Sequence, residues 1–399
     1  MSAWVQIVAV LLACVAGGWA MRRVGQAATG NKPVFRDMPL SVAFGYVLGA
    51  VLLVWIVWSY YLARTLEPPE ANKYFFFRLA IDGFVLFAIA AWLFRLVGRH
   101  VGPQSTRRLF RQMPLTASFG ILTILIYAVL AIFAGVLAPY GQAEVFPQVN
   151  VLPGGNPATG GDPAHILGTD QIGRDLLSRL IYGAQNTVGI AFATTCIAFF
   201  LGASLGFLAA TLQGWLDQVL SRTVDVLMAI PSLIFALLLM TIASAWAGSE
   251  RWLLTLYMVL IIAVIDSTRV FRLARAVGLN IVVMDYIEAA KLRGEGMGYL
   301  IFKEILPNAT APLLAEFGLR FCFVFLTIAS LSFLGVGIQP PLADWGTMVR
   351  DLAQFINFAQ FSPLTAALPL LAAGAIALLT VAVNFVVDWM LQRSSGLKE

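Results

Sequence analysis

The chain has 399 residues, of which 60% are hydrophobic and only 12% are charged, and its formal net charge is +5. Soluble globular chains carry about 25% charged residues, so this composition, with a mean hydropathy of +0.84, excludes a soluble enzyme, a disordered tail and a secreted disulfide scaffold. The basic residues gather in short loops beside apolar blocks, which is typical of membrane topology and not of nucleic-acid binding.

Nine apolar blocks predict nine membrane-spanning helices. Most are long enough to cross a hydrocarbon core about 30 Å thick. In lipid the backbone must satisfy its own hydrogen bonds, which favours helices. The blocks are Ala3–Ala20, Leu40–Ala63, Phe75–Val97, Leu115–Ala138, Thr187–Thr211, Val224–Ala247, Trp252–Phe271, Ala311–Val336 and Pro363–Asp388.

The charges of the loops predict the orientation of these helices. Two basic loops are expected in the cytoplasm. They carry Arg22, Arg23, Lys32 and Arg36 after the first block, and Arg99, Arg107, Arg108 and Arg111 after the third. Alternation then places the N-terminus outside, the C-terminus inside, the loops 139–186 and 337–362 outside, and the loop 272–308 inside. We divide the chain into three N-terminal spans (1–100), a basic cytoplasmic linker (101–114) and a six-span domain (115–392).

Two of the blocks leave an alternative open. The first block is either a retained helix or a signal peptide, although no Lys or Arg precedes it, as a signal peptide would require. The third block is interrupted by Arg78, Asp82 and Arg95, so a tilted or re-entrant segment is the alternative to a plain span.

The sequence shows no catalytic, metal or cofactor motif. It has no G-x-x-x-x-G-K-[ST] phosphate loop, no G-x-S-x-G elbow and no H-E-x-x-H helix. Cys14, Cys196 and Cys322 all lie inside apolar blocks, and we interpret them as buried hydrophobic residues. We therefore expect a chain that catalyses no reaction itself.

Four charged residues fall inside predicted spans, where charges are costly and often functional. Asp266 and Arg269 are three residues apart in the seventh block, and Glu316 and Arg320 are four apart in the eighth. Each spacing permits an ion pair within one helix. These residues either line a solute pathway or neutralise one another as part of helix packing.

The predicted cytoplasmic loop 272–308 contains a short helix-turn-helix. Glu288–Arg293 consists of strong helix formers, and Gly294 is a plausible C-cap in the left-handed conformation. A second helix is expected over Met297–Ile305, and Pro307 should end it and begin the next span. Such a unit can dock on a partner and pass its motion to the membrane helices.

This loop resembles a known signature. EAAKLRG followed by ILPN is similar to the EAA signature of ATP-binding-cassette importer permeases, with one departure at Glu304, where the family often has isoleucine. The matching residues are Glu288, Ala289, Ala290, Gly294, Leu306 and Pro307.

Two further segments resemble dipeptide and oligopeptide permeases of the second-subunit type. HILGTDQIGRDLLSRLIYGAQNTVGIA, residues 165–191, is similar to their external segment. Its motif residues are Gly168, Thr169, Asp170, Gly173, Arg174, Asp175, Ser178 and Arg179. LSFLGVGIQPPLADWGTMV, residues 331–349, is similar to the end of their fifth core helix. Its motif residues are Leu331, Ser332, Phe333, Leu334, Gly335, Gly337, Pro340, Pro341, Trp345 and Gly346.

Two details qualify these motifs. Asp170, Arg174, Asp175 and Arg179 alternate in sign, so we expect them to pair on a solvated surface; a contact with a substrate-delivering protein is the alternative. Many family members carry a glutamate just before LSFLG, where this chain has Ile328, so no pathway residue is carried over from the family.

The resemblance implies an all-α membrane protein with a six-helix type I importer core, preceded by three extra helices. It further implies a second homologous permease, two cytoplasmic ATPases that hold ATP and Mg²⁺, an external solute-binding protein, and a place in the bacterial inner membrane. Di- or oligopeptides are the expected solutes, although close relatives carry nickel, opines and sugar-linked peptides. Two alternative classes are an ion-driven transporter and a membrane enzyme. The first would need paired broken helices with ion ligands, and the second would need a catalytic cluster; the sequence indicates neither feature.

Overall fold

The computed structural model describes residues 3–28, 38–66, 74–248, 250–360 and 362–394. Within these ranges the regular structure is helical, apart from three isolated β-bridges between residues 152 and 175. Lys32 and Arg36, which helped to predict the topology, lie outside the described residues. The all-α class expected from the sequence is confirmed for the described residues.

The chain divides into two compact units, Met1–Ile81 and Asp82–Glu399. The first contains α1 (Ala3–Ala28) and α3 (Leu40–Thr65), which pack along each other. Gly18 allows this contact, because a Cβ there would lie 2.9 Å from the backbone nitrogen of Phe44. The division falls inside α4 (Phe75–His100), one continuous helix without a re-entrant break.

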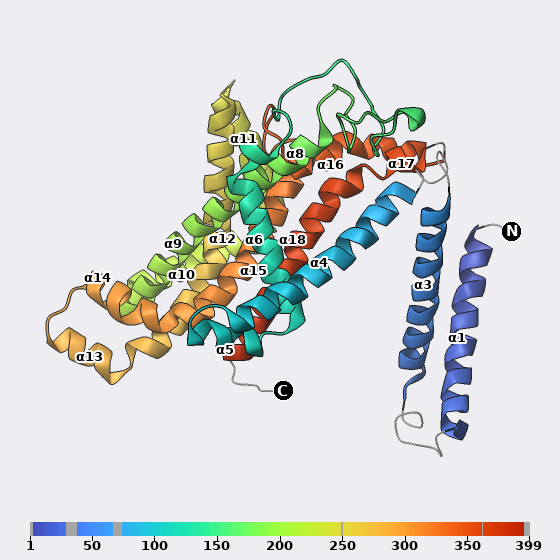
Figure 1. Ribbon diagram of the computed structural model, residues 1–399. Coiled ribbons are helices and arrows are strands. Elements are labelled where there is room, and N and C mark those ends of the chain that lie inside the picture. The colour runs from blue at the N-terminus through green and yellow to red at the C-terminus, as the bar shows by residue number, and fades with distance from the viewer. Residues whose placement is uncertain (1–2, 29–37, 67–73, 249, 361, 395–399) are drawn as a thin grey trace. The chain divides into compact units, whose positions relative to one another are not determined.

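The second unit begins within α4 and is a bundle of long helices with shorter ones at its ends (Figure 1). The expected linker 101–114 is largely the helix α5, where Phe110 packs on Phe94 with ring centroids 5.2 Å apart. The elements are α5 (Gln104–Gln112), α6 (Leu115–Ile132), α7 (Ala134–Leu137), η2 (Pro157–Thr159), α8 (Leu176–Gly183), η3 (Ala184–Val188), α9 (Gly189–Leu212), α10 (Gly214–Ala229), α11 (Ser232–Ala247), α12 (Arg251–Val282), α13 (Asp285–Leu292), α14 (Met297–Tyr299), η4 (Leu300–Ile305), α15 (Leu306–Phe333), α16 (Trp345–Ala353), η5 (Gln354–Phe358), α17 (Pro363–Ala366) and α18 (Pro369–Ser394).

All nine predicted blocks are largely helical, but the fourth is interrupted at Phe133 and the ninth between Ala366 and Pro369, and several helices extend beyond the predicted blocks. Among the described residues, seven helices are long and apolar enough to span a membrane, and eight if the bent pair α10–α11 is one span. The first predicted block forms α1, which is not among these seven helices, so its prediction as a membrane span is not confirmed. The helix through α8, η3 and α9 begins at Leu176, inside the stretch predicted as an external loop, and α12 continues to Val282.

The predicted block Val224–Ala247 is not one unbroken helix. α10 and α11 meet at a bend of 90°. Pro231 lies between them and Ile230 before it is extended, because proline lacks an N–H and disfavours a helical conformation in the preceding residue. The continuous apolar sequence therefore contains a sharp bend that its composition does not indicate.

α9 and α12 pack together more extensively than any other pair of described helices. Gly202 and Gly206 lie one turn apart on α9, and a Cβ at these positions would lie 2.5 Å from the carbonyl oxygen of Ser267 and 2.7 Å from that of Phe271. From α12, Gly278 faces Ala210 in the same way. Small residues spaced four apart let membrane helices approach closely.

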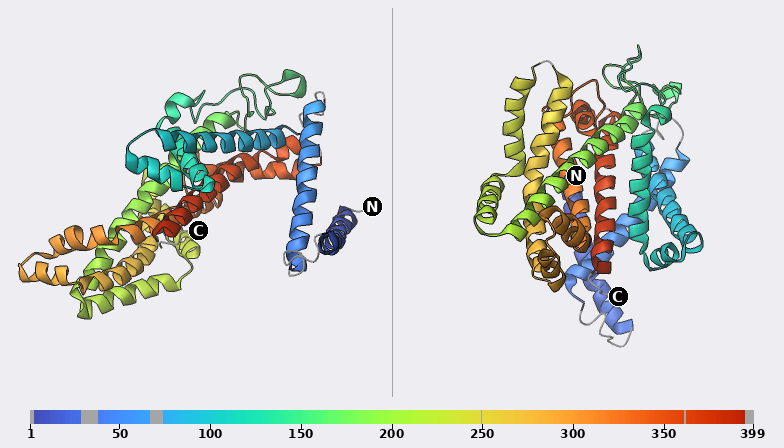
Figure 2. Two further views of the ribbon diagram at one scale, coloured as in Figure 1. Left: turned by 60° about the horizontal axis from the view of Figure 1, so that its bottom comes forward. Right: turned by 90° about the vertical axis from the view of Figure 1, so that its left-hand side faces the viewer.

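The three motifs identified in the sequence lie at two opposite ends of this bundle. The segment 139–175, α8 and α16 gather at one end, and α13 with α14 lies at the other, as all views show (Figures 1 and 2). The loops predicted as external thus share one end, and the loop predicted as cytoplasmic occupies the other.

We predict that Gly206→Val destabilises the permease-like bundle by about 1–3 kcal/mol, because overpacking forces the helices apart. Thermal unfolding of the detergent-purified protein measures this. Gly189→Val is the matched control on the same helix, since nothing lies within 4 Å of a Cβ at Gly189. Equal shifts in melting temperature for the two variants would show that close α9–α12 contact is not what the glycine provides.

Candidate functional site

The helix α13 ends in the turn that the sequence predicted. Gly294 has φ of +78°, and its N–H donates to the carbonyl of Lys291, while the N–H of Glu295 donates to that of Ala290. These two bonds form a Schellman motif, which suits glycine because it tolerates the left-handed conformation. The predicted C-cap at Gly294 is confirmed.

The two faces of α13 differ sharply. Ile287 and Ala290 are fully buried against the bundle, whereas Glu288 and Ala289 are exposed and the side chain of Leu292 is 85% exposed. No described residue forms an ion pair or hydrogen bond with the carboxylate of Glu288. α13 therefore presents an unpaired acid and an apolar side chain outward, which is the arrangement of a docking surface.

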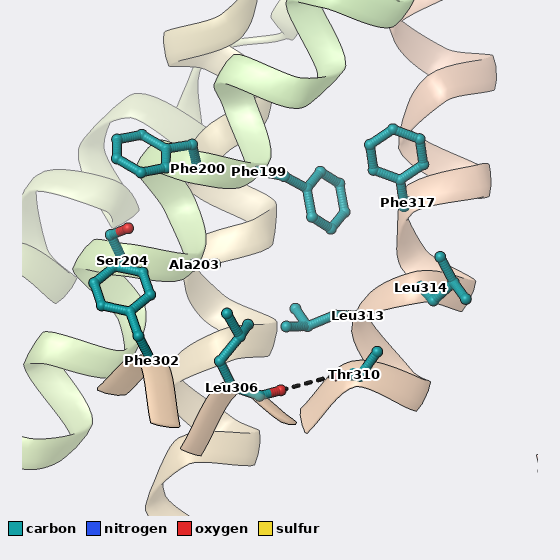
Figure 3. Close-up of a pocket in the computed structure, with 10 residues that line it drawn as sticks. All are labelled: Phe199, Phe200, Ala203, Ser204, Phe302, Leu306, Thr310, Leu313, Leu314 and Phe317. Carbon is teal, nitrogen blue, oxygen red and sulfur yellow. Dashed lines mark hydrogen bonds between the residues drawn. The ribbon is translucent and has the colours of Figure 1, made fainter. Parts of the chain in front are cut away.

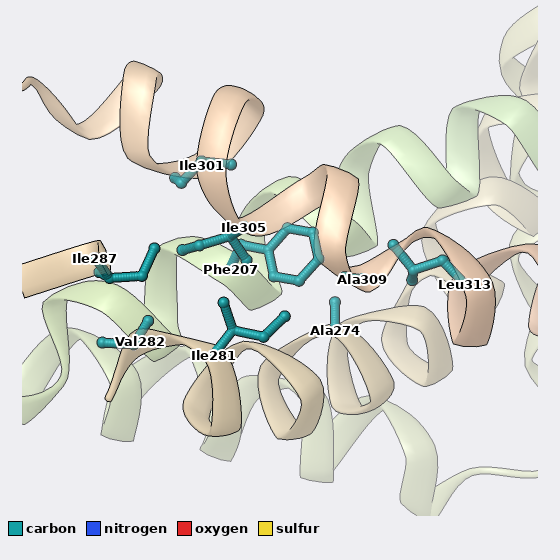
Figure 4. Packing of buried hydrophobic residues seen from close by; sticks show 9 residues of the cluster. All are labelled: Phe207, Ala274, Ile281, Val282, Ile287, Ile301, Ile305, Ala309 and Leu313. Carbon is teal, nitrogen blue, oxygen red and sulfur yellow. The ribbon is translucent and has the colours of Figure 1, made fainter. Parts of the chain in front are cut away.

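A cluster of buried side chains, the base cluster, connects α13 to three long helices (Figure 4). Ile287 of α13 and Ile301 and Ile305 of η4 meet residues from the ends of the long helices. These are Phe207 of α9, Ala274, Ile281 and Val282 of α12, and Ala309 and Leu313 of α15. Because protein interiors are close-packed and transmit strain, a displacement of α13 must shift the ends of α9, α12 and α15.

The second helix of the loop differs from the prediction. Pro307 does not end it: the helix from Met297 continues to Phe333, and its residues Leu300–Ile305 form a π-helical turn. A π turn shifts the hydrogen-bond register, and Pro307 then occupies the first turn of α15, where its missing N–H costs least. Leu306 packs against the base cluster and Pro307 is exposed.

An apolar hollow of about 290 Å³ adjoins the base cluster between α9, η4 and α15 (Figure 3). Phe199 and Phe317 in its lining pack against each other, with ring centroids 5.0 Å apart and ring planes inclined by 60°. Ser204 and Thr310 are the only hydroxyl side chains in its lining. The hollow offers no charged partner for a polar solute.

At the other end, three charged residues of the motif 165–191, Asp170, Asp175 and Arg179, are buried and not solvated. Asp170 is 3% exposed and accepts hydrogen bonds of 2.7 Å from the guanidinium groups of both Arg174 and Arg179. Arg179 is also buried. The expected pairing of Asp170 with Arg174 and Arg179 therefore exists, but the expected solvated surface is wrong, because Asp170 and Arg179 are buried.

The pKa of Asp170 reflects this setting. Burial favours its neutral form, but hydrogen bonding from the backbone of Arg174 and the positive charges of Arg174 and Arg179 outweigh that effect. The pKa of Asp170 is consequently held below its ordinary value of 3.8.

Asp175 has a different partner from the one expected. Its carboxylate caps the N-terminus of α8 by accepting hydrogen bonds from the backbone N–H and the hydroxyl of Ser178. Its other oxygen lies 2.9 Å from Nδ1 of His165. Gly168 and Gly173 have φ of +82° and +87°, and Thr169 is buried with its hydroxyl bound to the backbone of Gln148.

The third motif packs directly on the second. Trp345 is 2% exposed, and its indole N–H donates to the carbonyl of Leu180 in α8. Gly183 lies against the Trp345 ring and Gly346 against the backbone of Ala329. The hydroxyl of Ser332 accepts the N–H of Ile338, at the tight turn that Gly335 and Gly337 permit.

The other residues of the third motif divide between core and surface. Leu331 is fully buried, whereas Phe333 and Leu334 are exposed. Pro340 and Pro341 follow in the loop, where the carbonyl of Pro340 accepts from Arg251 at the start of α12.

Three residues that the sequence reasoning did not single out join these motifs. Asp344 is fully buried and caps α16 through the N–H of Thr347, and burial raises the pKa of its carboxyl. Thr187 donates to Asp344, and Asn186 donates to the carbonyl of Ala343. The spacing Asp-x-x-Thr at residues 344–347 is an N-cap pattern that was available in the sequence.

The charged residues within the spans pair differently from the prediction. Glu316 and Arg320 form the expected pair, with Nε and Oε1 2.7 Å apart. Asp266 does not pair with Arg269; it lies 3.8 Å from Nη1 of Arg320, across from α12 to α15. Neighbours in space thus override the spacing along one helix.

Comparison with known proteins agrees with this architecture. Residues 202–395 match the family described as "Binding-protein-dependent transport system inner membrane component". The chain is 37% identical over 243 residues to the dipeptide transport system permease protein DppC of Escherichia coli K12, an alignment that covers 61% of this chain and 78% of the relative.

The chain belongs to this family of importer permeases.

Other relatives are similar in the same way. The dipeptide transport system permease protein DppC of Haemophilus influenzae is 34% identical over 245 residues, covering 61% of this chain and 80% of the relative. The glutathione transport system permease protein GsiD of Pectobacterium atrosepticum is 30% identical over 245 residues, covering 61% of this chain and 76% of the relative.

Family membership defines the general role of this permease. It is a multi-pass inner membrane component of an ABC importer, and it is not the catalytic subunit. Permeases of this family carry no cofactor, since ATP is held by the ATPase partners. The family match lies in the C-terminal part of the chain, so the N-terminal helices are additional to the matched core.

We predict that Asp170→Asn destabilises the permease by on the order of 3 kcal/mol at pH 7, because it leaves buried arginines without their charge partner. The pKa of Asp170 is lower in the folded protein than in the unfolded chain. The ionised carboxylate of Asp170 therefore stabilises the fold fully above the unfolded value of 3.8, and this contribution is lost as the pH falls through the folded pKa.

Melting temperatures of the wild type and Asp170→Asn, measured from pH 7 to below pH 4, check this. The difference between them should narrow at the acidic end. Glu144→Gln, an exposed acid in the same segment, should show no such gap, and a wild-type advantage that persists unchanged in acid would contradict the prediction.

A second prediction compares the two adjacent alanines of the signature. Ala290→Leu should detach α13 from η4, at a cost of about 1–3 kcal/mol, because the site is fully buried. Ala289→Leu should leave the packing intact, because Ala289 is exposed. Hydrogen exchange of the α13 amides measures this, and equal protection in the two variants would refute the assigned faces.

Proposed function

We propose that this permease forms the membrane pathway of an ATP-driven importer together with a second, homologous permease, and that it carries di- or oligopeptides. The relatives named for dipeptide and glutathione transport support the solute class. The observation that supports the coupling role most strongly is the two-faced helix α13, exposed on one side and fixed to the base cluster on the other.

In this proposal, two ATPases bind at the cytoplasmic end, with one of them against the exposed face of α13 that carries Glu288 and Leu292. When ATP closes the ATPase pair, α13 is displaced. The base cluster passes the displacement to α9, α12 and α15, because its buried side chains connect α13 and η4 with these helices. The bundle then changes the side to which the pathway is open.

The opposite end of the bundle faces outside in this orientation, with the N-terminus outside and the C-terminus in the cytoplasm. There the segment 139–175 and α16 form a platform for a solute-binding protein. Buried ion pairs of Asp170 and the link from Arg174 to Asp351 (3.6 Å) support its rigidity. A rigid platform suits a partner that must deliver solute over one opening.

We predict that Glu288→Lys reduces co-purification of the ATPase subunits and lowers ATP-dependent peptide uptake at least tenfold. Truncation or reversal at a charged contact costs on the order of 2–5 kcal/mol. Glu250→Lys makes the same charge change at the other end of α12, where Glu250 is exposed, and should leave ATPase binding unchanged.

Uptake is measured with the complete importer in proteoliposomes, with labelled di- and oligopeptides and, as comparison arms, nickel ions and an opine. Peptide uptake that requires both ATP and the binding protein supports the proposal. If Glu288→Lys retains its ATPases and transports at the parental rate, α13 is not the coupling helix; if only nickel or the opine moves, the solute class is wrong.

A further inference from the structure

The charged cluster between α12 and α15 lies within the membrane-spanning part of the permease. Arg320 is nearly buried, with a side chain 10% exposed, and it stands between Glu316 of its own helix and Asp266 of α12. Asp266 lies near the middle of α12, and Glu316 and Arg320 lie in the middle of the span Met297–Phe333. One arginine is thus shared by two carboxylates at a depth where charge is costly.

Arg269 is the remaining charge of this cluster, and it forms no ion pair with any residue in the described part of the chain. Its guanidinium carbon lies 5.8 Å from the centroid of the Phe323 ring, and that of Arg320 lies 4.6 Å from the same ring. Such contacts are favourable cation–π interactions, but they leave the hydrogen-bond donors of Arg269 unused.

The exposure of Phe323 shows which way this cluster faces. Its side chain is 47% exposed, and Arg269 beside it is partly exposed, so the ring and the guanidinium lie at the surface of the subunit. A charged side chain within a membrane span faces the protein interior or a water-filled cavity and avoids lipid. This surface is therefore turned away from lipid.

From this geometry we infer that the face of α12 and α15 around Phe323 lines the solute pathway, and that Arg269 binds a carboxylate of the passing solute. The inference rests on the proposed import function and adds the chemistry of the pathway. The planar guanidinium offers paired N–H donors that match a carboxylate, the group that every peptide with a free C-terminus carries. Glu316 and Asp266 form their ion pairs with Arg320 and not with Arg269.

The first test needs no knowledge of the solute. In a permease whose native cysteines Cys14, Cys196 and Cys322 are replaced by alanine, Thr327→Cys places a thiol one turn beyond Phe323 on α15. The assembled importer is treated with an anionic sulfonate and a cationic ammonium thiol reagent of equal length. The anionic reagent should react faster, and adding Arg269→Gln should lower the ratio of the two rates by about tenfold.

Val264→Cys is the control for position, since Val264 is also exposed on α12 but is not a residue of the charged cluster. It should react with neither aqueous reagent. The inference is overturned if Thr327→Cys is unreactive, if Val264→Cys reacts as fast, or if Arg269→Gln leaves the rate ratio unchanged. If Arg269 formed a permanent ion pair with the second permease, Arg269→Gln would leave the rate ratio unchanged.

The second test measures transport. Arg269→Gln should lower uptake of a free-acid peptide by about tenfold or more, with ATPase subunits still bound, and Arg269→Lys should fall between it and the wild type because it keeps the charge. Parental uptake by Arg269→Gln would overturn the role in solute binding. If the wild type carries no peptide at all, the proposed solute class fails, while the labelling ratio still decides whether Arg269 lines a pathway for anions.

Discussion

The close approach of α9 and α12 is the contact on which the rest of the permease core depends. Gly202 and Gly206 bring the two backbones together, and Gly278 extends the contact to the end where α13 begins. In lipid there is no hydrophobic driving force between helices, so such backbone contact and van der Waals packing must hold them. The pair then acts as one rigid element.

Both functional ends are built on this element. At one end, Phe207 of α9 and Ile281 of α12 form the floor on which α13 and η4 pack. At the other, α8 and η3 continue α9 into the segment that binds Trp345 and Asp344. In the proposed transport cycle, a displacement of α13 would therefore act on helices that reach the opposite end of the bundle.

Charge is used in opposite ways along this permease. At the end formed by the segment 139–175, Asp170 accepts hydrogen bonds from Arg174 and Arg179, and these buried pairs stabilise the segment. Among the membrane-spanning helices, Arg320 forms ion pairs with Glu316 and Asp266, whereas Arg269 forms none with any described residue and lies beside an exposed ring. A satisfied buried pair is a structural element, whereas an unsatisfied charge at membrane depth indicates a ligand or a partner.

The amino-acid sequence alone determined the helical class, the positions of the apolar blocks, and the turn at Gly294. These follow from local chemistry: apolar length in lipid, and the tolerance of glycine for positive φ. The three motifs also indicated the family before any contact was known, because their residues occur as continuous segments.

The tertiary structure decided which of these residues meet. Asp266 forms an ion pair with Arg320 and not with Arg269. Asp175 contacts His165. The ion pairs of Asp170 are buried. Local spacing could not foresee this, because partners from another helix or loop compete with those on the same helix, and burial depends on what folds over a segment. Pro231 and Pro307 show the same limit: one makes a 90° corner and the other lies in a continuous helix, because the surrounding hydrogen bonds and packing decide what a proline does.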